Sequence, residues 1–294
     1  MEALLKIIFT NFFKIFSKIS PKYSAEIAWS IFCKPRIKKK PLRGIEKELL
    51  QQVKQYFIDS GEYKISVYEW RNSNNTNKPK TILLTHGWGG YALNYSHIIQ
   101  KLLEGGLNVI AYDSPAHGKS TGKKTNLLHN TQALLDVSQY AESVDALIGH
   151  SFGAMANAYA LELTKETSHL STVDKIVLIA GPNKLIDIFA SFAQAMQLPD
   201  NILAIFHQKL EIIAKRKIER MSVVEFLQHY TGETLVVHDH KDRVVPFSEA
   251  ETVANGFATA KLFATTGLGH FRILADNKIS DKIIYFLHAP TIKN

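Results

Sequence analysis

The run Gly149-His150-Ser151-Phe152-Gly153 constrains the fold of this chain more than any other feature. It matches the pattern G-x-S-x-G, in which a serine occupies a sharp turn between a strand and a helix. The glycines serve that turn, because a Cβ two residues either side of the serine would collide with the neighbouring strand or helix. An apolar run precedes the pattern at residues 144–148, and a helix-forming run follows it at residues 154–161. This order predicts an exposed hydroxyl at Ser151.

Short apolar runs alternate with helical stretches along most of the chain. A helix is predicted over residues 45–57, and an alternating, half-exposed strand over residues 63–70. Further strands are predicted at residues 81–85, 107–112, 144–148, 175–180, 234–238 and 261–264. Buried runs separated by helices are typical of βαβ units. The pattern therefore predicts an α/β fold, a mostly parallel twisted sheet flanked by helices.

One interval interrupts this alternation. Between Gly181 and Gly232 lie about fifty residues of helical pattern, more than a single crossover helix requires. We expect a helical cap inserted above the sheet at residues 183–232. The predicted organisation is then a helical N-terminal extension over residues 1–60, an α/β core over residues 61–182 and 233–294, and this cap.

A serine nucleophile needs a base, an acid that orients the base, and donors for an oxyanion. In open α/β sheets such groups lie just past the carboxyl ends of the strands. Asp239 and Asp242 follow the strand predicted at residues 234–238, and His270 follows the next strand after two glycines. Position favours Asp242 as the acid, with Asp239 as the alternative, and His270 as the base. The chain order is then serine, acid, histidine.

The loop at residues 85–90 follows the first predicted parallel strand and contains three glycines. Glycines allow backbone N–H groups to face a ligand, so the N–H groups of Trp88 and Phe152 are the predicted oxyanion donors. The side chains of Trp88, Phe189, Phe192 and Met196 are the predicted substrate contacts. Apolar cap residues of this kind favour an apolar acyl group. The alternative is that the cap side chains pack against the core.

These motifs resemble those of the α/β-hydrolase-fold serine hydrolases, of the esterase and lipase kind, over roughly residues 63–288. The resemblance rests on five motifs: His86-Gly87, the turn at residues 112–120, Gly149 to Gly153, Asp242-x-x-Val245-Pro246 and Gly269-His270. It implies that Asp242 rather than Asp239 is the triad acid and that His86 is structural. It also implies that the turn at residues 112–120 is a scaffold, so that His117 and Ser120 are not catalytic. The oxyanion loop reads His-Gly-Trp instead of the His-Gly-Gly-Gly of some esterases, which disfavours large tertiary-alcohol esters.

The expected function is cleavage of a small-molecule carboxylic ester with an apolar acyl group, through an acyl-enzyme and without a cofactor. A serine at the turn disfavours dehalogenase and epoxide-hydrolase chemistry, which need an aspartate there. The fold alone leaves thioesterase, lipase and C–C hydrolase activity open, and a non-enzymatic binding protein is the alternative of a different class. The experiment that separates enzyme from binding protein is labelling by a fluorophosphonate.

A metal site is not expected. The run His238-x-His240-x-Asp242 begins the H-x-H-x-D-H pattern of dinuclear zinc hydrolases, but Arg243 stands where the next histidine belongs. There is no P-loop, and no G-x-G-x-x-G follows a predicted strand. Cys33 is the one cysteine, which excludes an intrachain disulfide and fits a reducing compartment such as the cytoplasm. Its predicted role is that of a small apolar filler.

The net charge of +8 belongs to one end of the chain. Residues 1–43 hold ten Lys and Arg against two Glu, and the remaining 251 residues are balanced at 25 of each sign. Because the body is neutral and carries no nucleic-acid-binding motif, nucleic acid is not an expected partner.

Residues 4–19 form a predicted amphipathic helix. One face carries the apolar side chains Leu5, Ile8, Phe9, Phe12, Ile15, Phe16 and Ile19. The first interpretation is that this face packs on the body of the protein. The second is a peripheral contact with an anionic membrane through residues 1–43, assisted by the basic cluster at residues 34–43.

Overall fold

The computed structural model of the chain describes residues 12–36, 41–42, 44–72, 79–141, 143–167, 170 and 172–290. Within these ranges no helix has both the length and the apolar character needed to cross a bilayer. Leu5, Ile8 and Phe9 of the predicted amphipathic face lie outside the described residues, as do residues 37–40 and 43 of the basic cluster.

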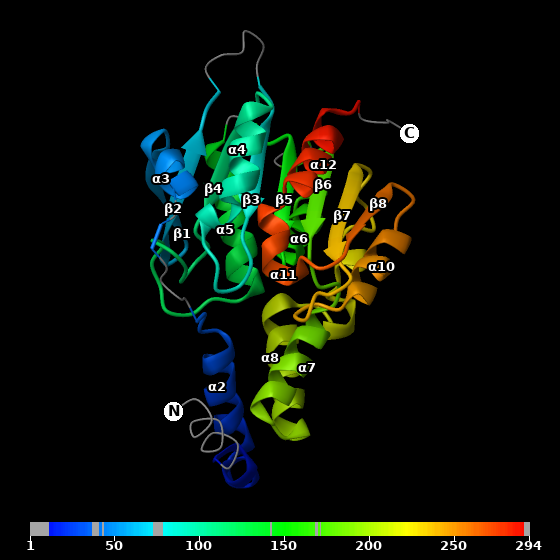
Figure 1. Cartoon of the computed structure of the whole chain (residues 1–294). Helices are drawn as coiled ribbons and strands as arrows, with labels where there is room; N and C mark the ends of the chain where they lie inside the picture. The colour runs from blue at the N-terminus through cyan, green and yellow to red at the C-terminus, as the bar shows by residue number, and fades with distance from the viewer. Residues whose placement is uncertain are drawn as a thin grey trace.

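An eight-stranded sheet forms the centre of the molecule (Figure 1). Its order is β1-β2-β4-β3-β5-β6-β7-β8. The pairs β1–β2 and β2–β4 are antiparallel, and all the other neighbours are parallel. The predicted mostly parallel sheet is therefore confirmed. The strands are β1 (Lys54–Ser60), β2 (Tyr63–Trp70), β3 (Thr81–Thr85), β4 (Asn108–Tyr112), β5 (Ala146–His150), β6 (Lys175–Ile179), β7 (Glu233–Asp239) and β8 (Ala260–Thr265).

Helices cover both faces of this sheet. Every residue of β3, β5, β6 and β7 is buried, as expected for parallel strands with helices on both sides. Alternate strand residues enter two different clusters: Leu83 packs with α5 and α6, while Ile82 and Leu84 pack with α4 and α12. The covering helices are α3 (Gly44–Gln51), α4 (Ser96–Glu104), α5 (Leu127–Tyr140), α6 (Phe152–Leu163), α10 (Phe247–Asn255), α11 (Gly269–Arg272) and α12 (Asn277–His288), with the short helices η1 (Ala92–Tyr95) and η3 (Ile273–Ala275).

The first strand was not predicted. The helix expected over residues 45–57 ends at Gln51, and Lys54–Ser60 is β1 instead. This strand pairs with β2 from Lys54↔Glu69 to Ser60↔Tyr63. The tight turn at Gly61, where φ is +55°, favours the hairpin over a longer helix. The predicted helical extension over residues 1–60 is wrong in its last part, because β1 belongs to the sheet.

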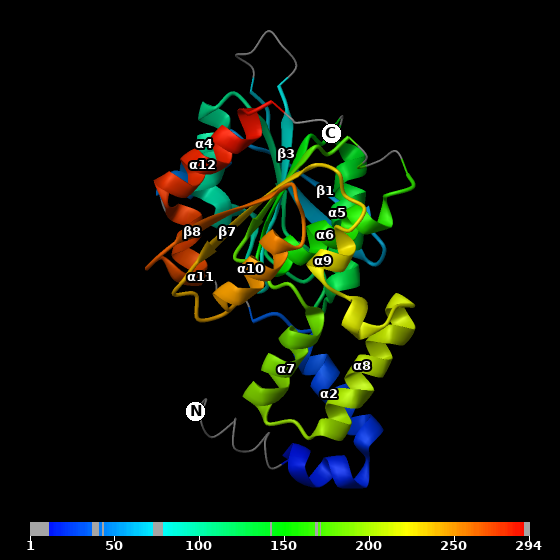
Figure 2. The ribbon, with the colours of Figure 1, turned by 90° about the vertical axis from the view of Figure 1, so that its right-hand side faces the viewer.

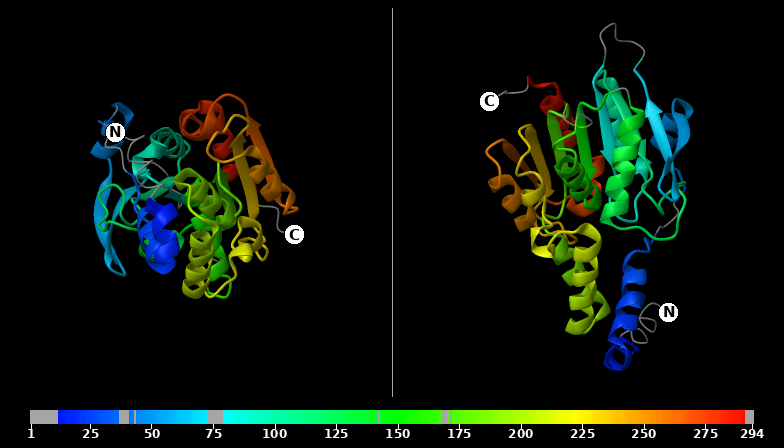
Figure 3. Two further views of the ribbon diagram at one scale, coloured as in Figure 1. Left: turned by 90° about the horizontal axis from the view of Figure 1, so that it is seen from below. Right: turned by 180° about the vertical axis from the view of Figure 1, so that it is seen from behind.

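Helices fill the long interval between β6 and β7, as predicted. They are α7 (Leu185–Met196), α8 (Asp200–Ala214), η2 (Ile218–Arg220) and α9 (Val223–Phe226), and we call them the helical insertion. Helices α7 and α8 extend beyond the sheet at the end where β6 and β7 terminate (Figures 1 and 3). Buried apolar side chains along one side of each helix, Phe189 and Phe206 among them, hold α7 and α8 together.

The N-terminal helices pack on this insertion. Residues 12–19 are helical, and α2 (Pro21–Phe32) runs beside α8 (Figure 2). The ring of Trp29 meets that of Phe206 at 5.5 Å, and the side chain of Asn201 donates to the carbonyl oxygen of Ser17 at 3.4 Å. The first of the two interpretations of this segment was packing on the body of the protein, and the observed contacts go to the helical insertion.

Candidate active site

Ser151 occupies the turn between β5 and α6. Its backbone has φ +53° and ψ −123°, a strained conformation for a residue with a side chain. The turn is closely packed, since a Cβ on Gly149 would lie 2.5 Å from the Cα of Ala154. A Cβ on Gly153 would collide with the carbonyl oxygen of Thr85 at the end of β3. The turn inferred from the sequence is therefore present, and both glycines are needed for it.

Gly153→Ala should destabilise the fold. The added methyl group meets backbone oxygen, which cannot rotate away, so we expect a loss of about 1–3 kcal/mol in the free energy of unfolding. Urea denaturation followed by tryptophan fluorescence measures it. Gly44→Ala is the matched control, because a Cβ there meets nothing within 4 Å. Equal stability of the two variants would contradict the packing described for the turn.

Three side chains meet at this turn in a hydrogen-bonded chain. The Nε2 atom of His270 lies 3.0 Å from the Oγ atom of Ser151. The Nδ1 atom of the same ring lies 2.7 Å from the Oδ2 atom of Asp242. A carboxylate only accepts, so the His270 Nδ1–H donates to Asp242, and Nε2 is left to accept from the serine hydroxyl. The side chains of His270 and Asp242 are almost completely buried. The structure thus brings together the three residues that the sequence placed after three different strands.

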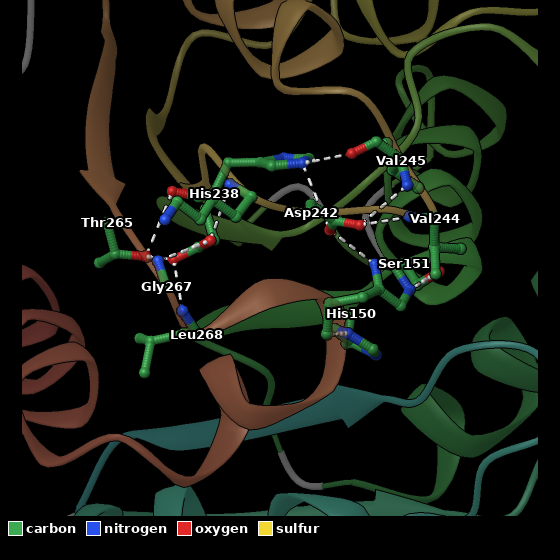
Figure 4. Close-up of polar contacts among 12 residues, drawn as sticks. His150, Ser151, His238, Asp242, Val244, Val245, Thr265, Gly267 and Leu268 are labelled. Carbon is green, nitrogen blue, oxygen red and sulfur yellow. Dashed lines mark hydrogen bonds and ion pairs between the residues drawn. The ribbon is translucent and has the colours of Figure 1, made fainter.

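Asp242 is held by the loop that carries it. Its second oxygen, Oδ1, accepts from the N–H of Val244 at 2.7 Å and from the N–H of Val245 at 3.0 Å (Figure 4). Burial alone would raise the pKa of Asp242, but hydrogen bonds from His270 and from these two N–H groups keep it below its ordinary value. The carboxylate therefore stays ionised beside His270.

Asp239 has a different set of partners. Its carboxylate accepts from the hydroxyl of Thr265 at 2.8 Å and from the N–H groups of Leu268 and Gly267 at 2.9 and 3.1 Å; Figure 4 labels these three partners. Burial would raise the pKa of Asp239, but these hydrogen bonds, that of Leu268 foremost, hold it well below the ordinary value. Asp239 thus secures the loop that leads to His270, while Asp242 contacts the imidazole itself.

The histidines of the H-x-H-x-D run do not form a metal centre. The Nε2 atom of His238 lies 3.0 Å from the carbonyl oxygen of Val245 and 3.5 Å from Asp242, while the ring of His240 packs on Phe247 with 3.8 Å between centroids. Burial lowers the pKa of His238, which favours the neutral ring. In the part of the chain that the structure describes, no three His, Cys, Asp or Glu side chains are grouped to hold a metal ion.

His86 holds the start of the loop at residues 85–90. Its Nε2 atom accepts from the N–H of Ser114 at 2.9 Å, so Nδ1 carries the proton and donates to the carbonyl oxygen of Gly87 at 2.8 Å. Burial lowers the pKa of His86 to about 4, so the ring is neutral near pH 7. These contacts agree with the structural role that the family resemblance implies for His86.

His117 holds the same loop further along. The N–H of Gly89 donates to its Nε2 atom at 2.9 Å, and its Nδ1 atom donates to the carbonyl oxygen of Pro115 at 2.9 Å. Burial, with a smaller contribution from His86, lowers the pKa of His117 to about 3. The sequence placed His117 outside the catalytic residues but did not show this contact, because nothing in the turn indicates which loop it faces.

The two predicted oxyanion donors belong to segments next to the serine, and the rings of Trp88 and Phe152 are in contact at 5.2 Å. Phe152 is the first residue of α6, so its N–H has no partner within the helix. The N–H of Trp88 donates to no residue among those described. A Cβ on Gly87 would lie 2.9 Å from the Cβ of Ser151, so the backbone of this loop runs directly beside the serine. The arrangement can present two free N–H groups to an oxygen next to Ser151.

A cavity of about 580 Å³ opens beside Ser151. Its apolar wall comes from the end of α2, the loop of Trp88, and α7 with Phe192 and Met196, and also from Phe152, Pro182 and residues 244–246. Charged side chains also border it; they are Lys34, Arg36, Asp187 and Glu249. The cavity lining therefore includes three of the four predicted substrate contacts, Trp88, Phe192 and Met196.

Phe189 is the exception among the predicted substrate contacts. Its side chain is 1% exposed and does not line the cavity. It lies behind the wall, with its ring 4.8 Å from that of Phe32 and 6.1 Å from that of Phe206. Phe192 contacts Phe32 and Phe206 as well, but it is only partly buried and lines the cavity, whereas the ring of Trp29 on α2 also packs on Phe189.

The sequence did not predict that α2 contributes to this cavity. Ile31 and Phe32 at its C-terminal end line the cavity, and the ring of Phe32 stacks on Trp88 at 5.9 Å. The next residue, Cys33, is buried, and burial raises the pKa of its thiol to about 12. Its carbonyl oxygen accepts from the N–H of Thr125 at 2.7 Å, which joins the end of α2 to the core. A buried, protonated thiol agrees with the role of filler.

The sheet order, the strained serine turn and the helical insertion define the class of protein: it is an α/β hydrolase. A family model described as "Serine aminopeptidase, S33" matches residues 76–240, more than half of the chain. The protein belongs to this family of hydrolases, and the resemblance that the motifs indicated is confirmed.

Curated relatives match shorter parts of the chain. An uncharacterized abhydrolase domain-containing protein of Dictyostelium discoideum is 30% identical over 94 residues, which are 30% of this chain and 10% of that protein. A monoacylglycerol lipase of Mycolicibacterium smegmatis is 32% identical over 75 residues, which are 26% of this chain and 24% of that enzyme. The aligned parts thus span a quarter or less of these relatives' own length.

Solved structures match nearly the whole fold. The Pyrococcus furiosus esterase Pf2001 superposes with a TM-score of 0.64 at 21% identity, covering 86% of this chain and 98% of that one. Est1E of Butyrivibrio proteoclasticus, with ferulic acid bound, gives a TM-score of 0.59 at 18% identity, covering 79% and 96%. A thioesterase domain from the curacin biosynthetic pathway gives 0.57 at 17%, covering 81% and 99%. At these identities the likeness concerns the fold alone.

Proposed function

We propose that the protein is a serine hydrolase that cleaves carboxylic esters with apolar acyl groups through an acyl-enzyme. The observation that carries this proposal is the hydrogen-bonded chain from Ser151 through His270 to Asp242, which opens into an apolar cavity. The family supports hydrolysis in general, and the cavity supports the choice of an apolar acyl group.

Acylation begins when the Oγ atom of Ser151 attacks the ester carbonyl carbon and its proton passes to Nε2 of His270. Asp242 stabilises the imidazolium that forms and keeps Nδ1 protonated. The N–H groups of Trp88 and Phe152 bind the oxyanion, and one such donor is worth about 3–4 kcal/mol in the transition state. When the C–O bond to the alcohol breaks, His270 returns the proton to the leaving oxygen.

Deacylation repeats these steps with water. His270 takes a proton from water as its oxygen attacks the acyl carbon, and the same two N–H groups bind the second oxyanion. The Ser151–acyl bond then breaks, and the proton on His270 goes to Oγ. The carboxylic acid leaves, and the enzyme returns to its starting state.

The proposal is tested by labelling with a fluorophosphonate probe and locating the adduct by mass spectrometry. A hydrolase of this kind forms an adduct on Ser151 that is lost in Ser151→Ala, whereas a binding protein on the same fold forms none. A chain-length series of p-nitrophenyl esters, matching acyl thioesters and an aminoacyl anilide then identifies the leaving group. Faster turnover of the thioesters would favour the alternative proposal, an acyl thioesterase.

Met196→Trp should shorten the preferred acyl chain. Met196 lines the cavity on α7, and a larger ring there reduces the space for a long acyl group. We expect kcat/KM to fall by about tenfold or more for a long-chain p-nitrophenyl ester, since one lost methylene contact is worth ~1–3 kcal/mol. The acetate ester should be unaffected.

The control for this variant is Gln194→Trp, on the exposed side of the same helix and outside the cavity lining. It should leave the whole chain-length profile unchanged. A Met196→Trp enzyme with an unchanged profile would show that the acyl group does not occupy this cavity.

A further inference from the structure

The N-terminal helix of residues 12–19 has apolar side chains on two opposite sides. Phe13 is completely buried, and Ser17, one turn later, is buried too, so this side packs on the helical insertion. Ile15 and Ile19 lie about 200° further round the helix and are 64% and 72% exposed. Tyr23, the third residue of α2, is 59% exposed, and its ring meets that of Phe16 at 5.9 Å.

This exposed side is the apolar face that the sequence indicated. A helix that only packs on its own protein needs one apolar side, and that need is met here by Phe13. The exposed isoleucines add nothing to the packing and leave large apolar surface in water. Phe12 and Phe16, whose rings stack at 5.0 Å, are partly buried; Phe12 packs against the buried cluster of Phe13, and Phe16 lies between Phe12 and Tyr23. Large apolar side chains exposed close together on a protein surface indicate an interaction site.

Lysines accompany the exposed apolar residues at each turn. Lys14, Lys18 and Lys22 each directly precede Ile15, Ile19 and Tyr23, and all three are exposed. In the described part of the chain these three lysines make no ion pair. The nearby carboxylate of Glu26 pairs with Lys209 instead. We call these six residues the basic apolar face. Three unpaired cations beside two isoleucines and a tyrosine complement a surface that is both anionic and apolar.

The basic apolar face lies at the end of the molecule farthest from the sheet (Figure 2). Here the helix of residues 12–19 meets the start of α8, and α2 rises from it beside α8. The opposite end of α2 lines the cavity with Ile31 and Phe32. One helix therefore connects the exposed face to the wall of the cavity.

We propose that the basic apolar face docks this protein on an anionic lipid surface. Lysines draw the face to the anionic headgroups, and the isoleucines and the tyrosine enter the boundary between headgroups and acyl chains. The proposal goes beyond the proposed function and does not depend on it, because binding to lipid is measured without any substrate. If both proposals are right, α2 holds the cavity one helix length, ~18 Å, from the lipid surface.

The test is sedimentation of the full chain with phosphatidylglycerol–phosphatidylcholine vesicles and with phosphatidylcholine vesicles. We expect binding to the anionic vesicles, little binding to the neutral ones, and weaker binding at high salt. The triple variant Lys14→Glu, Lys18→Glu, Lys22→Glu should bind at least about tenfold more weakly. The double variant Ile15→Ser, Ile19→Ser should also lose binding, and it keeps the charge unchanged.

The matched control reverses three exposed lysines elsewhere: Lys47→Glu, Lys123→Glu, Lys278→Glu. It lowers the net charge equally but should keep most of the binding. Equal losses in the two triple variants would overturn the proposal, since net charge alone would then explain binding. The proposal would also be overturned if the full chain did not sediment with anionic vesicles. A third contrary result would be a dimer in solution that the double variant Ile15→Ser, Ile19→Ser separates into monomers, since the face would then be a protein interface. Thermal melts confirm that each variant is folded.

Discussion

Ser151→Ala is expected to lower kcat for a p-nitrophenyl ester by roughly 10⁴- to 10⁶-fold. Its hydroxyl is the one that His270 Nε2 contacts, at 3.0 Å, and no attack on the carbonyl can start without it. The fold should survive, because the alanine keeps the Cβ and the backbone conformation of the turn. Steady-state kinetics on the purified variant measures the loss, and a urea melt confirms the fold.

The control is Ser191→Ala, which also removes a hydroxyl that borders the cavity. It should change kcat only slightly. The double variant Ser151→Ala, His270→Ala should be about as slow as either single variant, because the two groups act as a unit. If Ser151→Ala kept more than about one per cent of the activity, another group would have to be the nucleophile.

Much of the fold could be predicted because local pattern and tertiary structure agree there. The parallel strands are continuous apolar runs, since helices cover both of their faces, and each predicted run lies within two residues of an observed strand. The active-site positions follow from the same logic. Ser151, Asp242 and His270 each stand just after a strand, and the parallel sheet brings those strand ends to one edge.

The wrong predictions lie where the type of an element, or the direction of its side chains, depends on a residue that is distant in the sequence. Residues 54–57, the first part of β1, were assigned to a helix because the pairing of β1 with β2 is not visible in a short window of sequence. Phe189 and Phe192 stand three residues apart on α7, and only the position of α2 decides that the first is buried and the second lines the cavity. The contact between His117 and the N–H of Gly89 joins two loops that no local signal connects.

Asp242→Asn should lower kcat by roughly 10⁴-fold with a small effect on stability. The asparagine can keep the acceptor for the N–H groups of Val244 and Val245, but its NH2 group then faces Nδ1 of His270. That arrangement favours the tautomer with the proton on Nε2, which cannot accept the proton of Ser151. Kinetics and a urea melt on the same preparation separate the two effects.

Asp239→Asn is the matched comparison, and the opposite pattern is expected. The side chain of Asp239 accepts hydrogen bonds from the loop before His270, so losing its charge should cost about 1.5–3 kcal/mol of stability and leave much of kcat. Because its pKa is lowered in the folded protein, its contribution is complete above the unfolded pKa of about 3.9 and is lost as the pH falls through the folded value. Urea melts at decreasing pH should therefore show that the free energy of unfolding depends less on pH in Asp239→Asn than in the unaltered protein. If Asp239→Asn lost kcat as Asp242→Asn is expected to, while Asp242→Asn stayed active, the roles of the two carboxylates would be reversed.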